Sequence, residues 1–141
     1  MERRFPNRPF IVLMKTAKGI HEKIREEMLN HKLNVTEFSV LEVLYQKGTM
    51  TIQQICQNVL ISSGSMTYVI DKLEKRGLLK RSACPNDRRA IHVSLTDEGF
   101  NLMDTIMPNY LDMVDGLFEV LDPEETETFL KLLKKVNIKV E

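Results

Sequence analysis

Two consecutive stretches in the middle of the chain decide its fold: TIQQICQNVLISSGSMTYVIDKLEKRG, residues 51–77, and LLKRSACPNDRRAIHVSL, residues 78–95. In the first stretch, Thr51 and Gln54 have the spacing of a capping box, in which each side chain satisfies a free backbone N–H at the start of a helix. After this short helix and a break, we expect Ser62 or Ser63 to cap a second helix that ends at Gly77. The stretch therefore predicts a helix-turn-helix.

The second stretch changes to the period of a β-strand. Residues 90–95 alternate apolar and polar side chains, as a half-buried strand does, and residues 78–82 are a shorter strand candidate. Between them lies a polar turn, residues 83–89, with two arginines at its exit. We therefore predict a two-stranded hairpin directly after the helix-turn-helix, which is the arrangement of a winged helix.

Helices are predicted on both sides of this centre, because apolar residues recur there at intervals of three and four. Before the centre we expect a helix over about residues 9–31, and a second helix that starts at Thr36 as its N-cap and stops at Gly48. After the centre, a long helix starts at Thr96, and a last helix follows Asp122 as its N-cap.

The predicted fold class is therefore mainly α with a small β-hairpin wing: a winged helix-turn-helix flanked by N- and C-terminal helices. Pro108 lies inside the long helix and is expected to bend it, because proline removes one backbone hydrogen bond. A length of 141 residues fits a single domain with a real core.

The charge of the chain is zero overall but unevenly distributed. The 20 Lys and Arg side chains balance the 20 Asp and Glu side chains, which argues against a protein that binds nucleic acid through net charge alone. Counted by segment, however, residues 1–61 carry +3, residues 62–96 carry +4 and residues 97–141 carry −7. Such asymmetry is a hint of nucleic-acid or membrane contact by the basic part.

Other classes of protein are excluded by the sequence pattern. The apolar runs fall short of the roughly 20 residues of a membrane-spanning helix, and the five apolar residues at 10–14 are too few for a signal peptide. Two cysteines do not make a disulfide framework, and His21, His31 and His92 share no metal-ligand spacing. We therefore expect a cytoplasmic protein without a membrane segment, metal or cofactor.

The second helix of the helix-turn-helix is the candidate recognition helix. Small hydroxyl side chains at its N-terminus would allow close approach to phosphates or base edges. Its outward face continues in polar and basic residues at steps of three and four: Ser65, Tyr68, Lys72, and Lys75 or Arg76. The alternative is an ordinary surface helix, which also carries Lys and Ser on its outer face.

The hairpin adds a second candidate contact. Arg88 and Arg89 lie next to a tight turn, and an arginine on such a tip can reach into a minor groove, whose negative potential attracts guanidinium groups. Asp87 could hold an arginine in one rotamer through a charge-assisted hydrogen bond. The alternative is a solvated charged turn without a nucleic-acid partner.

Several motifs together resemble the MarR (multiple antibiotic resistance regulator) family of winged-helix proteins. Asp87-Arg88-Arg89 followed by Leu95-Thr96-Asp97-Glu98-Gly99 is similar to the Asp-x-Arg…Leu-Thr-x-x-Gly signature of that family. Ser65-Met66-Thr67 and Leu73-Glu74-Lys75-Arg76-Gly77-Leu78 resemble its recognition helix and the exit from it. The similarity extends over the whole chain, including both terminal helices.

The resemblance implies a homodimeric regulator, mostly a repressor, that binds a pseudo-palindromic operator in double-stranded DNA. It implies a single domain over residues 1–141, a DNA-binding part over 33–99, and dimerisation helices over 1–32 and 100–141. Arg89 would enter the minor groove with Asp87 as its positioning partner, whereas Leu95 and Thr96 would be structural. The candidate DNA-binding residues are Ser62, Ser63, Ser65, Thr67, Tyr68, Lys72, Arg76, Asp87, Arg88 and Arg89.

Members of that family release DNA when a phenolic ligand binds or when a cysteine is oxidised. The family's peroxide sensors carry their cysteine near the start of the first helix, but residues 9–28 contain none, so that mechanism does not carry over. Cys84 lies among cationic wing residues, which favour the reactive thiolate, and Cys56 is expected to be partly buried. Either is a candidate sensor; the alternatives are an incidental surface thiol and a small core residue. We expect a small phenolic or quinone-like effector.

Two other functions compete with the regulator. One is a winged-helix subunit that contacts proteins and has no specific DNA site. The other is a small thiol enzyme with Cys84 as nucleophile and His92 as base, but hairpin strands offer neither an enclosed pocket nor oxyanion donors. We therefore predict that the protein is not an enzyme.

Overall fold

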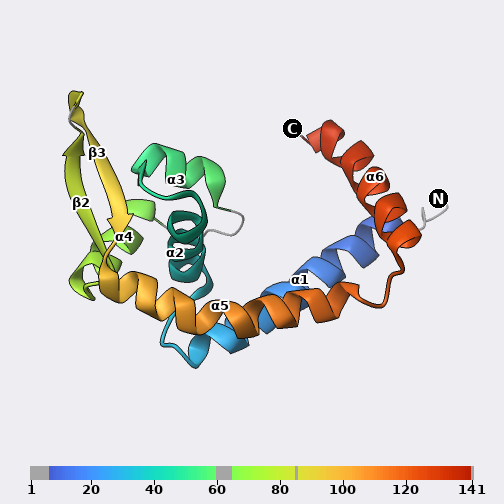
Figure 1. Cartoon of the computed structure of the whole chain (residues 1–141). Coiled ribbons are helices and arrows are strands. Elements are labelled where there is room, and N and C mark those ends of the chain that lie inside the picture. The colour runs from blue at the N-terminus through green and yellow to red at the C-terminus, as the bar shows by residue number, and fades with distance from the viewer. Residues whose placement is uncertain (1–6, 60–64, 85, 141) are drawn as a thin grey trace, which may run out of the picture. The chain divides into compact units, whose positions relative to one another are not determined.

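The computed structural model describes residues 7–59, 65–84 and 86–140. Its elements follow in the order α1 (Arg8–Leu29), α2 (Val35–Lys47), β1 (Met50–Thr51), α3 (Ile52–Asn58), α4 (Met66–Lys75), β2 (Leu79–Cys84), β3 (Asp87–Leu95), α5 (Asp97–Phe118) and α6 (Pro123–Val140) (Figure 1). The mainly helical class with a small sheet is as predicted. The chain divides into two compact units, Met1–Ile106 and Met107–Glu141, and the boundary lies inside α5.

The start of α2 differs from the sequence prediction. Its N-cap is Asn34 rather than Thr36, and the side chain of Asn34 accepts a hydrogen bond from the backbone N–H of Glu37 at 2.7 Å. In return, the Glu37 carboxylate accepts from the backbone N–H of Asn34 at 2.9 Å, which completes a capping box. Thr36 is buried inside the first turn and does not cap the helix.

The two helices of the helix-turn-helix are α3 and α4. The predicted capping box of α3 is confirmed: Gln54 N–H donates to the Thr51 hydroxyl at 3.2 Å, and Thr51 N–H donates to the Gln54 side chain at 2.9 Å. The expected cap of α4 at Ser62 or Ser63 was wrong, and both residues lie outside the described residues. The N-cap is Ser65, whose hydroxyl accepts from Tyr68 N–H at 3.4 Å, so α4 is shorter than expected.

Glycine ends α4 as predicted. Gly77 has a φ of +77°, in the left-handed region that glycine adopts without a steric penalty. Its N–H donates to the Glu74 carbonyl at 2.9 Å, and Leu78 N–H donates to the Leu73 carbonyl at 3.1 Å. These two bonds satisfy carbonyls that the helix leaves free and turn the chain into β2.

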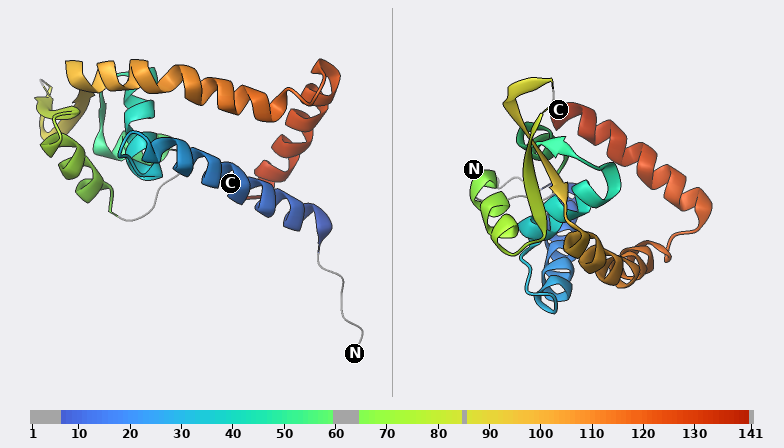
Figure 2. Two further views of the ribbon diagram at one scale, coloured as in Figure 1. Left: turned by 90° about the horizontal axis from the view of Figure 1, so that it is seen from below. Right: turned by 60° about the vertical axis from the view of Figure 1, so that its left-hand side comes forward.

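The wing is a three-stranded antiparallel sheet in the order β1-β3-β2, rather than a hairpin alone. Both long strands exceed their predicted bounds of 78–82 and 90–95, so that Asp87, Arg88 and Arg89 belong to β3 and not to the turn. The strand β1 was not predicted, because two residues are too short to show a period; Met50 pairs with Val93. Figure 2 shows the hairpin of β2 and β3.

The two C-terminal helices begin where the sequence predicts. Helix α5 runs through Pro108 without interruption. Asp122 caps α6 as predicted: its carboxylate accepts from Glu125 N–H at 2.8 Å, and its own N–H donates to the Glu125 carboxylate at 3.1 Å. Within the described residues of α6, however, every side chain is exposed or half-buried.

The core of the first unit lies between the winged-helix elements and the adjoining ends of α1 and α5. Ile24 and Met28 are buried on α1, whereas Leu13, on the same predicted stripe, is 40% exposed. The largest fully buried apolar side chains come from most elements of the unit: Met28, Leu33, Phe38, Leu41, Leu44, Ile55, Ile70, Leu73, Leu79, Met103 and Ile106. None of the described helices is long and apolar enough to cross a membrane.

Candidate nucleic-acid interface

The outward face of α4 is the first part of the candidate interface. Val69, Ile70 and Leu73 are buried and seat the helix in the core. On the opposite side, Thr67 is exposed and the Tyr68 side chain is 67% exposed. A phenol ring left in solvent at the first turn of a helix is available for contact with a groove, because its ring and hydroxyl offer both apolar and hydrogen-bonding surface.

The two cations farther along α4 face a buried carboxylate. Lys72 Nζ lies 3.8 Å from Glu37 Oε2, and a guanidinium nitrogen of Arg76 lies 3.7 Å from the same oxygen. The Arg76 guanidinium also donates to the Lys32 backbone carbonyl at 2.8 Å. The Lys72 and Arg76 side chains remain 49% and 31% exposed, so their outer parts still meet solvent.

A network between α4 and β2 links the candidate recognition helix to the wing. The Arg81 guanidinium donates to the Glu74 carboxylate at 2.9 Å and to the Asp71 carboxylate, and Arg81 N–H donates to Glu74 at 3.1 Å. These carboxylates raise the pKa of Arg81 above its ordinary value. The largest cause is the hydrogen bond to Asp71. Sequence reasoning did not find this network, because the spacings of seven and ten residues match no regular period.

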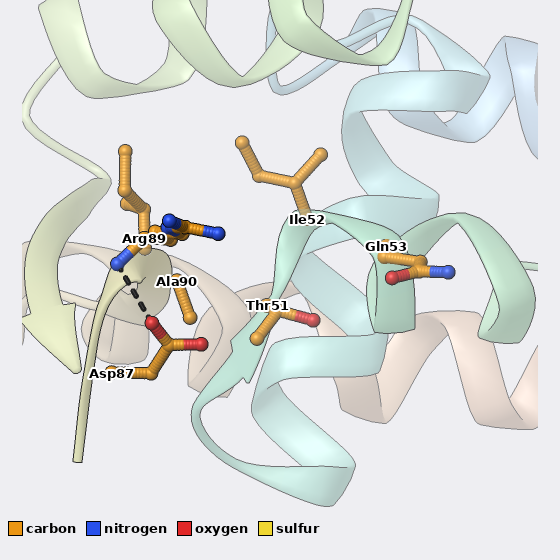
Figure 3. A pocket seen from close by; sticks show the side chains of 7 residues that line it. Thr51, Ile52, Gln53, Asp87, Arg89 and Ala90 are labelled. Carbon is orange, nitrogen blue, oxygen red and sulfur yellow. Dashed lines mark hydrogen bonds between the residues drawn. The ribbon is translucent and has the colours of Figure 1, made fainter.

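The wing arginines occupy the start of β3. Arg89 is exposed, and its backbone N–H donates to the Asp87 carboxylate at 2.9 Å (Figure 3). The expected partner of Asp87 was an arginine side chain, whereas this hydrogen bond joins its carboxylate to the Arg89 backbone at the start of β3. The Arg88 side chain lies outside the described residues.

A shallow hollow of about 370 Å³ lies between β3 and the start of α3. Figure 3 shows residues that line it: Asp87, Arg89 and Ala90 from the strand, and Thr51, Ile52 and Gln53 at the start of α3. The hollow brings the wing arginine next to the first helix of the helix-turn-helix. It is open to solvent, and we assign it no ligand.

The two cysteines are placed differently from expectation. Cys56 is exposed on α3, so the expectation of partial burial was wrong: the residue is one position after the buried Ile55 and therefore on the outer side of this short helix. Cys84 is half-buried at the end of β2. His92 pairs across the sheet with Ser82 rather than with Cys84. Among the described residues no group of three or more His, Cys, Asp or Glu side chains could hold a metal ion.

Comparisons with known proteins identify a family and a relative that this chain resembles. The family model described as "MarR family" matches residues 33–91. The chain is 42% identical over 129 residues to the HTH-type transcriptional regulator MhqR of Bacillus subtilis (strain 168), covering 92% of this chain and 89% of that protein.

Two solved structures have the same fold. The regulator BpsR of Bordetella bronchiseptica, described with the regulation of its DNA binding by 6-hydroxynicotinic acid, is 25% identical with a TM-score of 0.81, covering 97% of this chain and 98% of BpsR. MepR of S. aureus, solved in a complex with DNA, is 19% identical with a TM-score of 0.83, covering 98% of this chain and 100% of MepR. The extent of the match to MhqR, together with the family model over the winged helix, shows that the chain belongs to the MarR family of transcriptional regulators.

Proposed function

We propose that the protein is a homodimeric repressor that binds a pseudo-palindromic DNA operator. In each subunit α4 would enter the major groove and Arg89 would reach the adjacent minor groove. The observation that carries this proposal is the exposure of Thr67, Tyr68 and Arg89 on elements that the core and the Arg81 network hold rigidly. Such a protein would act in the cytoplasm, where bacterial DNA lies.

The proposed DNA contacts differ in kind. Hydroxyl groups at the start of α4 and the phenol of Tyr68 would contact phosphates and base edges, and the cations would contact phosphates or the minor groove. Asp87 would act indirectly, by holding the backbone from which Arg89 projects. The proposed set is Ser62, Ser63, Ser65, Thr67, Tyr68, Lys72, Arg76, Asp87, Arg88 and Arg89.

The proposed dimer would cover apolar surface of the terminal helices. Phe10, Val12 and Met14 are 60%, 61% and 53% exposed near the start of α1. On α6, large apolar side chains are exposed from Phe129 to the end of the helix: Phe129, Leu130, Leu132, Val136, Ile138 and Val140. Apolar exposure of this extent is typical of an interface. Sedimentation at micromolar concentration should give twice the 16.4 kDa mass of the chain, and replacing Leu130 and Val136 by Glu should yield monomers.

The proposed trigger is a small phenolic or quinone-like effector. BpsR, a relative with the same fold, is described with regulation by a small hydroxylated aromatic acid, which supports this chemical class. We expect a phenol or a quinone to release the operator, and the variant Cys56→Ser/Cys84→Ser separates binding from thiol modification. Release that persists in this variant indicates binding, whereas loss of release indicates modification of a thiol.

Selection of bound sequences from random DNA tests the main proposal. We expect an inverted repeat whose half-sites are centred about 10 base pairs apart, one turn of the double helix. Enrichment of no sequence, together with a protein that co-purifies with the chain, would instead favour a winged-helix subunit that contacts proteins.

A further inference from the structure

Glu37 is a carboxylate buried where the first turn of α2 meets α4. Its side chain is 2% exposed. One oxygen, Oε1, accepts the capping hydrogen bond from Asn34 N–H at 2.9 Å. The other, Oε2, is buried and accepts no hydrogen bond from the described residues. Because burying a charged oxygen without a partner is costly, this second oxygen requires an explanation beyond the cap.

The surroundings of Glu37 Oε2 supply this explanation. Two cations approach it, Lys72 of α4 at 3.8 Å and Arg76, the C-cap of α4, at 3.7 Å, and both belong to the proposed DNA-contacting face. Arg76 is held from a second side by its hydrogen bond to the Lys32 carbonyl. A single buried negative charge thus restrains two positive side chains whose outer parts remain in solvent.

We propose that Glu37 is a specificity-determining residue, which holds Lys72 and Arg76 so that they stabilise the operator complex but contribute little to binding of random DNA. The proposal rests on the proposed DNA-binding function. Glu37 itself touches no DNA in this scheme; it is a positioning residue that acts through the two cations.

The physical reason lies in the difference between the two kinds of complex. Binding to random DNA relies on mobile cations that follow any phosphate backbone and release its counterions. A lysine held near a buried carboxylate loses that freedom and has part of its charge offset. In a specific complex the backbone arrives at one fixed position, so a restrained cation contacts it with little further loss of side-chain entropy.

A purely structural role for Glu37 would require only the cap. Glutamine serves the same position of a capping box, because its amide oxygen can accept from the Asn34 N–H. The substitution Glu37→Gln therefore retains the cap and removes only the charge that faces Lys72 and Arg76. Folding of this variant is checked by its thermal unfolding curve.

The experiment measures affinity for the selected operator and for a random duplex of the same length, over a series of salt concentrations. For Glu37→Gln we expect tighter binding to random DNA, with a salt slope steeper by about 0.9 for each cation released. The ratio of operator affinity to random affinity should fall about fivefold, the effect of a partly exposed ion pair.

The matched control is Glu22→Gln on α1. Glu22 also forms an ion pair, with Arg25 at 3.0 Å, and the substitution removes the same charge while freeing a cation outside the winged helix. We expect its affinity ratio to equal that of the wild type. If Glu37→Gln leaves the ratio unchanged, or changes it only as much as Glu22→Gln does, the proposal is wrong.

A second variant changes Lys72, the more exposed of the two cations, and its folding is again checked by thermal unfolding. For Lys72→Gln we expect weaker operator binding and nearly unchanged random binding, because Glu37 already restrains this lysine. Equal weakening of both would show a freely mobile phosphate contact and overturn the proposal. A wild-type protein that selects no operator contradicts the proposed function, whereas an unchanged ratio in a protein that does bind an operator contradicts only the role of Glu37.

Discussion

The carbonyl oxygen of Leu78 occupies the place where a side chain on Gly99 would begin. A Cβ added to Gly99 would lie 2.1 Å from that oxygen, far inside the distance that real Cβ atoms keep. Gly99 lies in the first turn of α5, and Leu78 directly precedes β2. The glycine therefore allows the start of α5 to pack directly on the backbone between the recognition helix and the wing.

The neighbouring Thr96 joins the same three segments. Its hydroxyl donates to the Gly77 carbonyl at 2.6 Å and accepts from Gly99 N–H at 3.1 Å, while its own N–H donates to the Leu78 carbonyl at 3.1 Å. The Leu-Thr-x-x-Gly motif is thus a junction between the end of α4, the start of β2 and the start of α5. These contacts give a physical reason for the threonine and the glycine of the motif, Thr96 and Gly99.

We expect Gly99→Ala to destabilise the protein by about 1–3 kcal/mol, the range of overpacking in a rigid site. Backbone atoms of Leu78 cannot move aside as a flexible side chain could. Gly116→Ala on the same helix is the control: its Cβ would meet only a Glu119 side-chain oxygen at 3.9 Å, and the higher helix propensity of alanine should make it neutral or stabilising. Chemical denaturation measures both, and equal unfolding midpoints would contradict the steric argument.

Thr96→Val should cost about 1–2 kcal/mol, because the loss of the hydroxyl leaves the Gly77 carbonyl and the Gly99 N–H without this partner. Thr96→Ser keeps the hydroxyl and should retain most of the stability. The comparison separates the hydrogen bonds from the packing of the methyl group. A serine variant less stable than the valine variant would show that packing of the methyl group outweighs the hydrogen bonds.

The Arg81 network should couple the recognition helix energetically to the wing. In a double-mutant cycle with Asp71→Ala and Arg81→Ala we expect a coupling of about 0.5–1 kcal/mol, because these side chains are 49% and 22% exposed and solvent screens the pair. Amide hydrogen exchange in β2 should accelerate in Arg81→Ala. A coupling near zero would indicate that packing alone holds the wing against α4.

The Tyr45 hydroxyl donates to the Asp104 carboxylate at 2.6 Å, between α2 and α5. This hydrogen bond is the main reason that the pKa of Tyr45 is raised above its ordinary value of 10.0. A raised pKa in the folded state means that the bond contributes stability below about pH 10 and loses it as the pH rises through the folded-state value.

Asp104→Asn should therefore lower the pKa of Tyr45 toward its ordinary value. Spectroscopic titration of the tyrosines, with Tyr45→Phe to assign the Tyr45 signal, provides the measurement. An unchanged titration of Tyr45 in Asp104→Asn would rule out the carboxylate as the cause.

Arg89→Ala should weaken operator binding by tenfold or more while leaving the melting temperature nearly unchanged, because the side chain is exposed and loss of an arginine that hydrogen-bonds base edges costs about 1–3 kcal/mol. Arg25→Ala on α1 removes the same charge and serves as the control, since a long-range electrostatic effect would appear in both variants. Operator binding by Arg89→Ala equal to that of the wild type would remove the wing from the proposed interface.

Much of the fold follows from short-range sequence patterns. The capping box at Thr51, the glycine that ends α4, the period-two stretch of β3 and the cap at Asp122 were all predicted correctly, because each depends on residues within one or two turns of each other. The errors were also local. Asn34 and Ser65 cap their helices in place of neighbouring Thr and Ser residues, since several side chains can cap and only the path of the incoming chain selects one.

The sequence by itself determined the class, the family and the order of the helices and of the β2–β3 hairpin, because backbone periodicity, caps and the Leu-Thr-x-x-Gly motif each depend on residues close together in the chain. Only the tertiary structure decided which charges meet. Glu37 lies 35 and 39 positions before Lys72 and Arg76, and sequence spacing carries no information about such a contact until α2 and α4 pack together. Electrostatic pairing depends on distance in space and on exclusion of water, and both are consequences of the folded core.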